Sequence, residues 1–208
     1  MLDCSNNVVA SEAIAHAAGL IAGGGVVVYP TETVYGLGVD ASNARALDRL
    51  VTLKGREPGK PISVLVSDRH MLGDLVSEVP PLASLLMRRF WPGPLTIVLR
   101  AHTGLSPLLT SDTGGLGVRV SSHPMATALV EAVGRPVTTP SANPAGQRPP
   151  LHVDEARAYF GARVDCYLDG GRVAGEPAST VVDARGELKV IREGAIAHAT
   201  LLAVLQQS

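Results

Sequence analysis

The residues best suited to chemistry in this sequence are three cations in one short segment, Lys54, Arg56 and Lys60. The chain carries 18 basic side chains, of which only three are lysine, and two of those three lie in this segment. A lysine places a compact point charge that suits a phosphate group, whereas an arginine offers a planar fork of donors. The segment therefore indicates a phosphate site, although chance clustering of charges on a surface loop stays open at this point.

Hydroxyl and amide side chains gather at two further places, and each place adjoins a run that is typical of a buried strand. Residues 30–38 read Pro-Thr-Glu-Thr-Val-Tyr-Gly-Leu-Gly after Val26–Tyr29, and Ser141-Ala142-Asn143 follows Val137–Thr139. Polar groups at the ends of core elements are more often functional than polar groups on a solvated face. Their neutral hydrogen bonds suit a ribose, a base or a small polar substrate.

Two arginines extend this set, because Arg119 lies in a short expected strand and Arg192 lies near the end of another. Cations at strand ends can converge across a sheet on one anionic ligand, and an arginine can bind a phosphate or carboxylate through two parallel hydrogen bonds. Thr31, Thr33 and Ser179 add neutral hydroxyls. Taken alone, each of these residues also fits a structural role, as a surface ion pair or as a hydroxyl in a turn or at a strand edge.

Several common catalytic arrangements have no support in the sequence. Gly36-Leu37-Gly38 fits part of a dinucleotide-binding fingerprint, but residues 30–35 separate it from the strand it should follow, so we expect a turn there. Gly59-Lys60 lacks the earlier glycine and the following hydroxyl of a phosphate-binding loop. The six histidines and two cysteines show no metal-ligand spacing, and there is no Gly-x-Ser-x-Gly segment. Of the reaction types considered, phosphate chemistry without a covalent nucleophile on the protein is the one that the sequence still supports.

Composition indicates a compact globular chain with almost no net charge. Its 208 residues suffice for one substantial core, 46% of them are hydrophobic, the mean hydropathy is +0.21 and the formal net charge is −1. No global charge therefore draws the chain to nucleic acid or to an anionic membrane. The N-terminus does not read as a signal peptide, and no apolar run approaches the roughly 20 residues that span a bilayer. We expect a soluble, cytoplasmic protein.

Helices and strands are expected to alternate along the chain, without an internal repeat or a linker. The expected helices are 44–53 with Asn43 as its cap, 11–22, 82–90, 124–133, 153–160 and the last ten residues. The expected strands are 26–29, 62–66, 95–99, 117–120, 137–139, 164–168, 180–183 and 188–191. This alternation predicts an α/β fold in which residues 1–208 form a single three-layer domain around a twisted, mixed β-sheet.

Two of the polar segments together form a family signature. The YrdC-like family of threonylcarbamoyl-adenylate synthases carries a Lys-x-Arg…Ser-x-Asn pattern, which stands here as Lys54-Gly55-Arg56 and Ser141-Ala142-Asn143. In these segments the chain resembles the short, single-domain members of that family, over about residues 10–195 and in the same order throughout. The further matching segments are 30–38, 91–96, 117–120, 123–124, 179–183 and 191–194.

The resemblance implies an enzyme, a nucleotidyltransferase that makes L-threonylcarbamoyladenylate. The amine of L-threonine captures carbon dioxide from bicarbonate, and the resulting carbamate attacks the α-phosphorus of ATP and releases pyrophosphate. Downstream tRNA threonylcarbamoyl-transferase proteins then use the product to modify an adenosine of tRNA. The resemblance also implies Mg²⁺ bound with ATP, for which the protein need not supply a dedicated cage. Such chemistry needs aligned reactants, excluded water and offset negative charge.

The resemblance further implies a division of the site between the two larger substrates. Contacts to ATP are expected from Arg56, Lys60, Gly115, Ser141, Asn143, Pro149 and Arg192. Contacts to L-threonine are expected from Thr33, Arg119, Thr139 and Ser179, with Arg119 pairing with the carboxylate. Lys54 and Arg56 of the signature are the expected catalytic residues, and no protein ligand to a metal is expected.

Two positions depart from the family pattern. Leu65 stands where some members place a histidine near threonine, so that contact is expected to be absent or replaced. Ser121 follows Val120 where a proline is usual, which is expected to loosen the loop beside Arg119. Neither departure removes a charge that the implied chemistry requires.

Two other functions stay open from the sequence. One is a non-catalytic RNA-binding or ribosome-assembly factor, because members of the family have a concave basic surface compatible with RNA. The net charge of −1 and an aromatic content of only 3% argue against that reading. The other is a non-synthase paralogue of the same fold, a subgroup that lacks the full signature. The intact signature in this chain argues against it.

Overall fold

The computed structural model describes residues 2–3, 7–55, 59–175 and 177–206. The helices are α1 (Asn7–Ala22), α2 (Ala44–Lys54), α3 (Arg69–Gly73), α4 (Pro81–Phe90), α5 (Pro124–Val133), α6 (Val153–Phe160) and α7 (His198–Gln206), with the 3-10 helix η1 at Gly161–Arg163. The strands are β1 (Leu2–Asp3), β2 (Val27–Pro30), β3 (Tyr35–Gly38), β4 (Val64–Leu65), β5 (Leu95–Arg100), β6 (Gly115–Arg119), β7 (Val137–Thr138), β8 (Cys166–Asp169), β9 (Thr180–Asp183) and β10 (Lys189–Arg192). Within these ranges no helix is both long enough and apolar enough to cross a bilayer.

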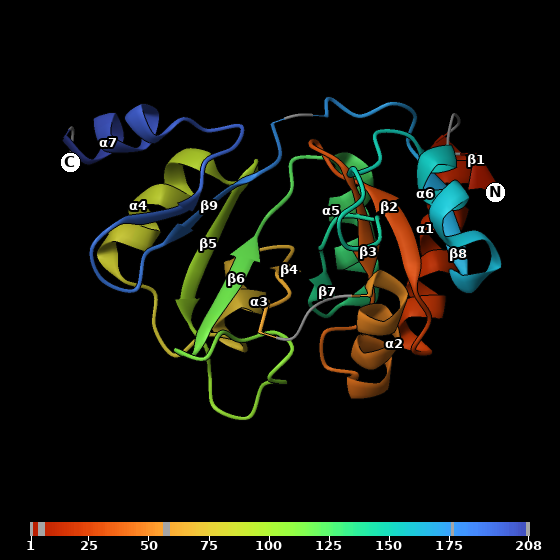
Figure 1. The fold of residues 1–208 in the computed structure, drawn as a ribbon, viewed down its shortest axis with the longest axis horizontal. Coiled ribbons are helices and arrows are strands. Elements are labelled where there is room, and N and C mark those ends of the chain that lie inside the picture. The colour runs from red at the N-terminus through yellow and green to blue at the C-terminus, as the bar shows by residue number, and fades with distance from the viewer. Residues whose placement is uncertain (1, 4–6, 56–58, 176, 207–208) are drawn as a thin grey trace.

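The strands form two mixed sheets that meet at a seam between β3 and β7. The first sheet has the order β1-β8-β2-β3, and the second has the order β10-β9-β5-β6-β4-β7. At the seam the amide of Leu37 donates to the carbonyl of Pro140 at 2.8 Å. The amide of Thr138 donates to the carbonyl of Val39 at 3.0 Å. Figure 1 shows the two sheets side by side. The expected α/β class with mixed strand pairing is confirmed, but the strands form two sheets where one was expected.

The first sheet is the middle layer of three. Successive side chains of a strand point to opposite faces, and β2 shows this alternation plainly. Val27 and Tyr29 belong to a core cluster with residues of α1 and α5, whereas Val28 belongs to a cluster with residues of α2 and α6. Helices therefore cover both faces of the first sheet, and β2 is rigidly held where it leads into the polar segment at 30–38.

Helix α4 covers the second sheet. Leu86 and Met87 of α4 are buried in the same core as Leu95, Ile97 and Leu99 of β5, and α7 packs on α4. Burial of this apolar surface is the main favourable term that fixes the strands. Strands β9, β5 and β6 are thus held next to one another, and β6 is the nearest of the three to the seam (Figure 1).

Local signals explain several helix boundaries. The side chain of Asn43 accepts a hydrogen bond from the amide of Ala46 at 3.2 Å, which is the expected cap of α2. The same helix ends at Gly55, whose φ of 57° lies in the left-handed region that glycine adopts without strain. Helix α5 begins at Pro124 because proline suits the first turn of a helix. Helices α5 and α6 have the bounds that the sequence predicts.

The expectation of a turn at Gly36–Gly38 is wrong, because these residues belong to β3. This strand pairs antiparallel with β2 and places Gly36 opposite Tyr29. A Cβ atom on Gly38 would lie 2.9 Å from both Cε1 of Tyr29 and Cγ1 of Val137. The glycines therefore make room for the Tyr29 ring, whose hydroxyl donates to the carbonyl of Thr138 at 2.8 Å across the seam.

Gly38→Ala is expected to destabilise the fold, because the added methyl group meets Tyr29 and Val137 where the two sheets join. Overpacking of this kind typically costs about 1–3 kcal/mol. Gly73→Ala is the matched control, since nothing lies within 4 Å of the Cβ position there. Urea unfolding followed by circular dichroism measures the free energy of unfolding of each variant. Equal stabilities would contradict this account of the seam.

Candidate active site

A cavity of about 460 Å³ lies where the two sheets meet. Its walls come from the loop between β2 and β3, from β5, β6 and β9, and from the segment after β7. Small-molecule sites typically have volumes of roughly 300–1,000 Å³. The cavity is therefore large enough for a ligand, and only the folded chain brings its walls together.

Most of the site residues predicted from the sequence line this cavity. Lys60 is exposed and adjoins Pro61, which lines the wall. Lys54 and Asn143 are buried beside Ser141. Arg56 lies outside the described residues. The predicted residues that line the cavity are Thr33, Gly115, Arg119, Thr139, Ser141, Pro149, Ser179 and Arg192.

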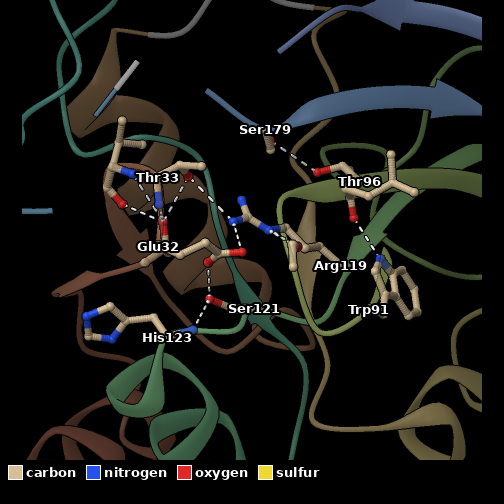
Figure 2. Close-up of polar contacts among 12 residues, drawn as sticks. Glu32, Thr33, Trp91, Thr96, Arg119, Ser121, His123 and Ser179 are labelled. Atoms are coloured by element: carbon tan, nitrogen blue, oxygen red, sulfur yellow. Dashed lines mark hydrogen bonds and ion pairs between the residues drawn. The ribbon is translucent and has the colours of Figure 1, made fainter. Parts of the chain in front are cut away.

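Arg119, at the end of β6, places a buried positive charge in the wall of the cavity (Figure 2). Its side chain is only 5% exposed, and its Nη2 contacts Oε1 of Glu32 at 2.6 Å. Its Nε donates to the carbonyl of Gly93 at 3.1 Å, and Nη2 lies 3.5 Å from the hydroxyl of Thr33. Across the part of the chain that the structure describes, Nη1 makes no hydrogen bond. It points away from the contacts with Glu32 and Gly93 (Figure 2).

Glu32 is a residue of this site that the sequence analysis did not select. Its Oε2 accepts a hydrogen bond from the hydroxyl of Ser121 at 2.5 Å. Burial raises the pKa of the Glu32 carboxyl, but the Arg119 guanidinium and the Ser121 hydroxyl outweigh burial and hold the pKa below its usual range. The carboxylate is therefore charged at neutral pH. The available signal was an acid between two threonines in an otherwise uncharged segment.

Arg192 reaches the same cavity from β10. Its Nη2 donates to the carbonyl and the hydroxyl of Ser179 at 2.8 and 3.1 Å. Burial, followed by the like charge of Arg119, lowers the pKa of Arg192. Two cations thus face one cavity, and an anion bound between them would stabilise the charged form of both. The contact between Arg192 and Ser179 also joins the two groups of residues that were assigned separately to ATP and to threonine.

One wall of the cavity contains an ion pair that the sequence did not indicate. Asp183 at the end of β9 pairs with Arg185 at 2.6 Å, and Arg185 also donates to the carbonyl of Thr113 at 2.8 Å. The hydrogen bond from Arg185 holds the pKa of Asp183 below its usual range. This pair fastens β9 to the loop before β6. Further lining residues with a hydroxyl, which the sequence does not assign to either substrate, are Thr31, Ser63, Thr96, Ser111 and Thr113.

Lys54 lies beneath the Ser141 loop (residues 139–147). It is buried in the last turn of α2, and its Nζ donates to the carbonyls of Ser141 and Asn143 at 2.5 and 2.7 Å. The amide of the Asn143 side chain donates to the carbonyls of Pro144 and Gln147 at 2.9 and 2.7 Å. The two signature residues therefore shape the loop that places Ser141 in the cavity wall.

Leu65, which stands where some family members have a histidine, lies in the core. It is 1% exposed and belongs to a cluster with Tyr29 and Val137. An apolar side chain in that place offers no hydrogen bond to a ligand, so the contact that a histidine would make is absent there.

The expected loosening at Ser121 is wrong. The hydroxyl of Ser121 donates to Glu32 and accepts from the amide of His123 at 3.1 Å. Its carbonyl accepts from the hydroxyl of Thr127 in α5, also at 3.1 Å. Ser121 therefore fastens the chain beside Arg119 to α5 and to the loop between β2 and β3.

A protein-family comparison agrees with this geometry. Residues 19–194 match the Sua5/YciO/YrdC family model, which is described as "Telomere recombination". The chain belongs to this family. The resemblance seen in the sequence segments is thereby confirmed.

Individual relatives are similar over most of the chain. The threonylcarbamoyl-AMP synthase of Bacillus subtilis is 37% identical over 194 residues, which make up 92% of this chain and 56% of that protein. The threonylcarbamoyl-AMP synthase of Halorhodospira halophila is 40% identical over 157 residues, or 76% of this chain and 82% of that protein. The crystal structure of Pyrococcus abyssi Sua5 complexed with L-threonine matches with a TM-score of 0.90 at 34% identity and covers 94% of this chain and 58% of that one. The matched region is thus just over half of the B. subtilis and P. abyssi proteins.

Lys54→Met is expected to destabilise the protein, because two buried carbonyls lose a charged donor. Hydrogen bonds to charged groups typically contribute about 1.5–3 kcal/mol, so a loss in that range is expected. Lys189→Met, on an exposed position of β10, is the control for the loss of a lysine charge. Chemical denaturation of both variants gives the comparison. Unfolding at the same denaturant concentration would show that the Ser141 loop does not depend on Lys54.

Proposed function

We propose that this protein is a threonylcarbamoyl-AMP synthase. It combines L-threonine, carbon dioxide from bicarbonate and ATP into threonylcarbamoyl-adenylate and pyrophosphate. The amine of threonine adds to carbon dioxide and loses a proton. A carbamate oxygen then bonds to the α-phosphorus of ATP while the bond from that phosphorus to the bridging oxygen breaks. The enzyme acts as a nucleotidyltransferase, because the adenylyl group passes from pyrophosphate to the carbamate.

The observation that carries this proposal is a pair of cations, the buried Arg119 and the more exposed Arg192, that face one cavity lined by hydroxyls. Two positive charges at one cavity favour anionic ligands, and the threonine carboxylate, the carbamate and the phosphates of ATP in this scheme are all anionic. The similarity to relatives named as threonylcarbamoyl-AMP synthases, and to a Sua5 protein crystallised with L-threonine, supports the same substrates.

Arg119 is well placed to bind the carboxylate of threonine. Its Nη1 is directed away from Glu32 (Figure 2), and a guanidinium suits a planar carboxylate. The hydroxyls of Thr33, Thr139 and Ser179 line the same cavity and can hydrogen-bond the hydroxyl and the amine of the substrate. A threonine held at several points would present its amine in a fixed direction, which is where such a reaction gains most of its rate.

The other side of the cavity would bind ATP. The Ser141 loop and Pro149 contribute backbone and hydroxyl groups for the nucleotide, and Arg192 contributes a charge. Lys60 and Arg56 of the signature segment would add positive charge for the triphosphate. In this scheme the side chains align the reactants and offset charge, so that no covalent intermediate on the protein is required.

We propose that Mg²⁺ enters this site with ATP. Among the residues whose structure is described, no group of three His, Cys, Asp or Glu side chains is arranged to hold a metal. Phosphate oxygens and water would therefore supply most of its ligands, as is usual for nucleotide-bound Mg²⁺. The product would pass to tRNA threonylcarbamoyl-transferase proteins, and the need for ATP and tRNA would place the reaction in the cytoplasm.

Pyrophosphate release is expected to require L-threonine, bicarbonate and ATP together. A coupled phosphate assay with each component omitted in turn measures this dependence. Mass spectrometry of the complete reaction should detect threonylcarbamoyl-adenylate. Release that is equally fast without threonine would contradict the synthase and leave an unspecific ATPase. A protein that binds RNA but releases no pyrophosphate would support a non-catalytic function.

Arg119→Lys is expected to weaken threonine binding much more than ATP binding, because the charge is kept but the planar fork is lost. The threonine Kd should rise roughly tenfold or more, since a hydrogen bond to a charged group contributes about 1.5–3 kcal/mol. Ser179→Ala should act in the same direction but more weakly, because a neutral hydrogen bond contributes about 0.5–1.5 kcal/mol. Calorimetric titration of each variant with each substrate gives the four values. Damage to ATP binding alone would overturn the assigned division of the cavity.

A further inference from the structure

Glu32 lies between two residues that line the cavity, Thr31 and Thr33, but its own side chain is directed elsewhere. Figure 2 shows the carboxylate turned toward Arg119 and Ser121. One oxygen contacts Arg119 at 2.6 Å and the other accepts from Ser121 at 2.5 Å. One oxygen thus forms an ion pair and the other a hydrogen bond within the protein, and Glu32 is not among the residues that line the cavity.

The contacts of Arg119 define the plane of its guanidinium. Nε is held by the carbonyl of Gly93 and Nη2 by the carboxylate of Glu32, so two of the three nitrogens are anchored at different points. A guanidinium is rigid and planar. Once two nitrogens are anchored, the direction of Nη1 is determined, and it is the nitrogen without a dashed line in Figure 2.

Glu32 is in turn held by the chain that leaves β6. Ser121 follows Arg119 by two residues, donates its hydroxyl to Glu32 and accepts from the amide of His123. Because Thr127 in α5 donates to the carbonyl of Ser121, this support is fixed to a helix rather than to a free loop. The order of contacts is α5 to Ser121, Ser121 to Glu32, and Glu32 to Arg119.

The charge of Glu32 also affects what Arg119 can do. A buried guanidinium without a partner is unfavourable and would turn toward any available acceptor. Glu32 neutralises it before a ligand arrives, so that the pair attracts an anion less strongly than a lone arginine would. Arg192, whose hydrogen bonds among the described residues go to neutral groups of Ser179, supplies a second positive charge nearby. What Glu32 contributes is therefore the orientation of Arg119 rather than the strength of attraction.

We propose that Glu32 is a positioning residue, which anchors Arg119 through Nη2 so that Nη1 is presented to the carboxylate of the amino-acid substrate. Ser121 is its support. This inference rests on the proposed synthase function, because that function supplies the carboxylate which Nη1 meets. Glu32 itself does not touch the substrate.

Three variants separate orientation from charge. Glu32→Ala removes the anchor, Glu32→Gln keeps an oxygen for Arg119 but removes the charge, and Ser121→Ala removes only the support. Glu131→Ala on α5 is the control, since this glutamate is exposed. Thermal unfolding of each variant verifies that it is folded. If Glu32→Ala does not fold, Glu32→Gln and Ser121→Ala carry the test.

The readouts are the Kd values for L-threonine and ATP from calorimetry, and kcat and KM from pyrophosphate release. For Glu32→Ala the threonine Kd and KM should rise by about 10- to 100-fold, the range expected for loss of a charged hydrogen bond, with ATP binding little changed. Glu32→Gln should recover most of this loss, and Ser121→Ala should show a smaller rise in the same direction. Glu131→Ala should match the wild type.

Two results would overturn the positioning role. One is wild-type threonine affinity in both Glu32 variants. The other is a loss of kcat in Glu32→Gln without a change in threonine Kd, which would indicate that the carboxylate takes part in proton transfer. These failures differ from failure of the proposed function, in which the wild-type protein itself shows no threonine binding and no threonine-dependent release of pyrophosphate.

Discussion

The buried ion pair between Arg119 and Glu32 is the constraint on which the site depends. Arg119 stands at the end of a strand in the second sheet, and Glu32 stands in the loop that leaves the first sheet. A guanidinium that is 5% exposed needs a partner, because an unpaired buried charge strongly destabilises a fold. The requirement for pairing therefore holds the loop of one sheet against the strand of the other. This ion pair therefore helps to set the shape of the cavity wall that the loop and the strand form together.

The same logic applies to the seam between the sheets, where close packing and hydrogen bonds combine. Gly36 and Gly38 allow the ring of Tyr29 to lie flat across β3, and its hydroxyl then reaches the backbone of Thr138 in the second sheet. Beneath the neighbouring loop, Lys54 donates to the carbonyls of Ser141 and Asn143, and the carbonyl of Ser141 also accepts from the amide of Asn143. Several polar groups at the seam thus have hydrogen-bond partners across it.

Patterns that are local in sequence were predicted well, and features that depend on distant partners were not. Helices α5 and α6 follow from apolar periodicity and their flanking residues, and their expected bounds are confirmed. Strand β3 was missed because a Gly-x-Gly segment reads as a turn until Tyr29 is known to lie across it. Similarly, Arg119 was found from its type and place in a strand, whereas Glu32 was not, because its importance comes from a contact with a residue far along the chain.

Arg119 and Arg192 have different partners, and this difference fits different ligands. Arg119 is neutralised by Glu32 and keeps one nitrogen for a ligand, which suits a carboxylate that carries a single charge and must be held in one direction. Within the described residues, the hydrogen bonds of Arg192 go to the neutral carbonyl and hydroxyl of Ser179, which do not compensate its charge, and this suits a multiply charged phosphate chain. The hydroxyl of Ser121 is neutral and donates to Glu32. It therefore helps to hold Glu32, and with it Arg119, without adding a charge near the bound amino acid. Within one cavity, Arg119 would thus orient the carboxylate of the amino acid, whereas Arg192 would attract the phosphates.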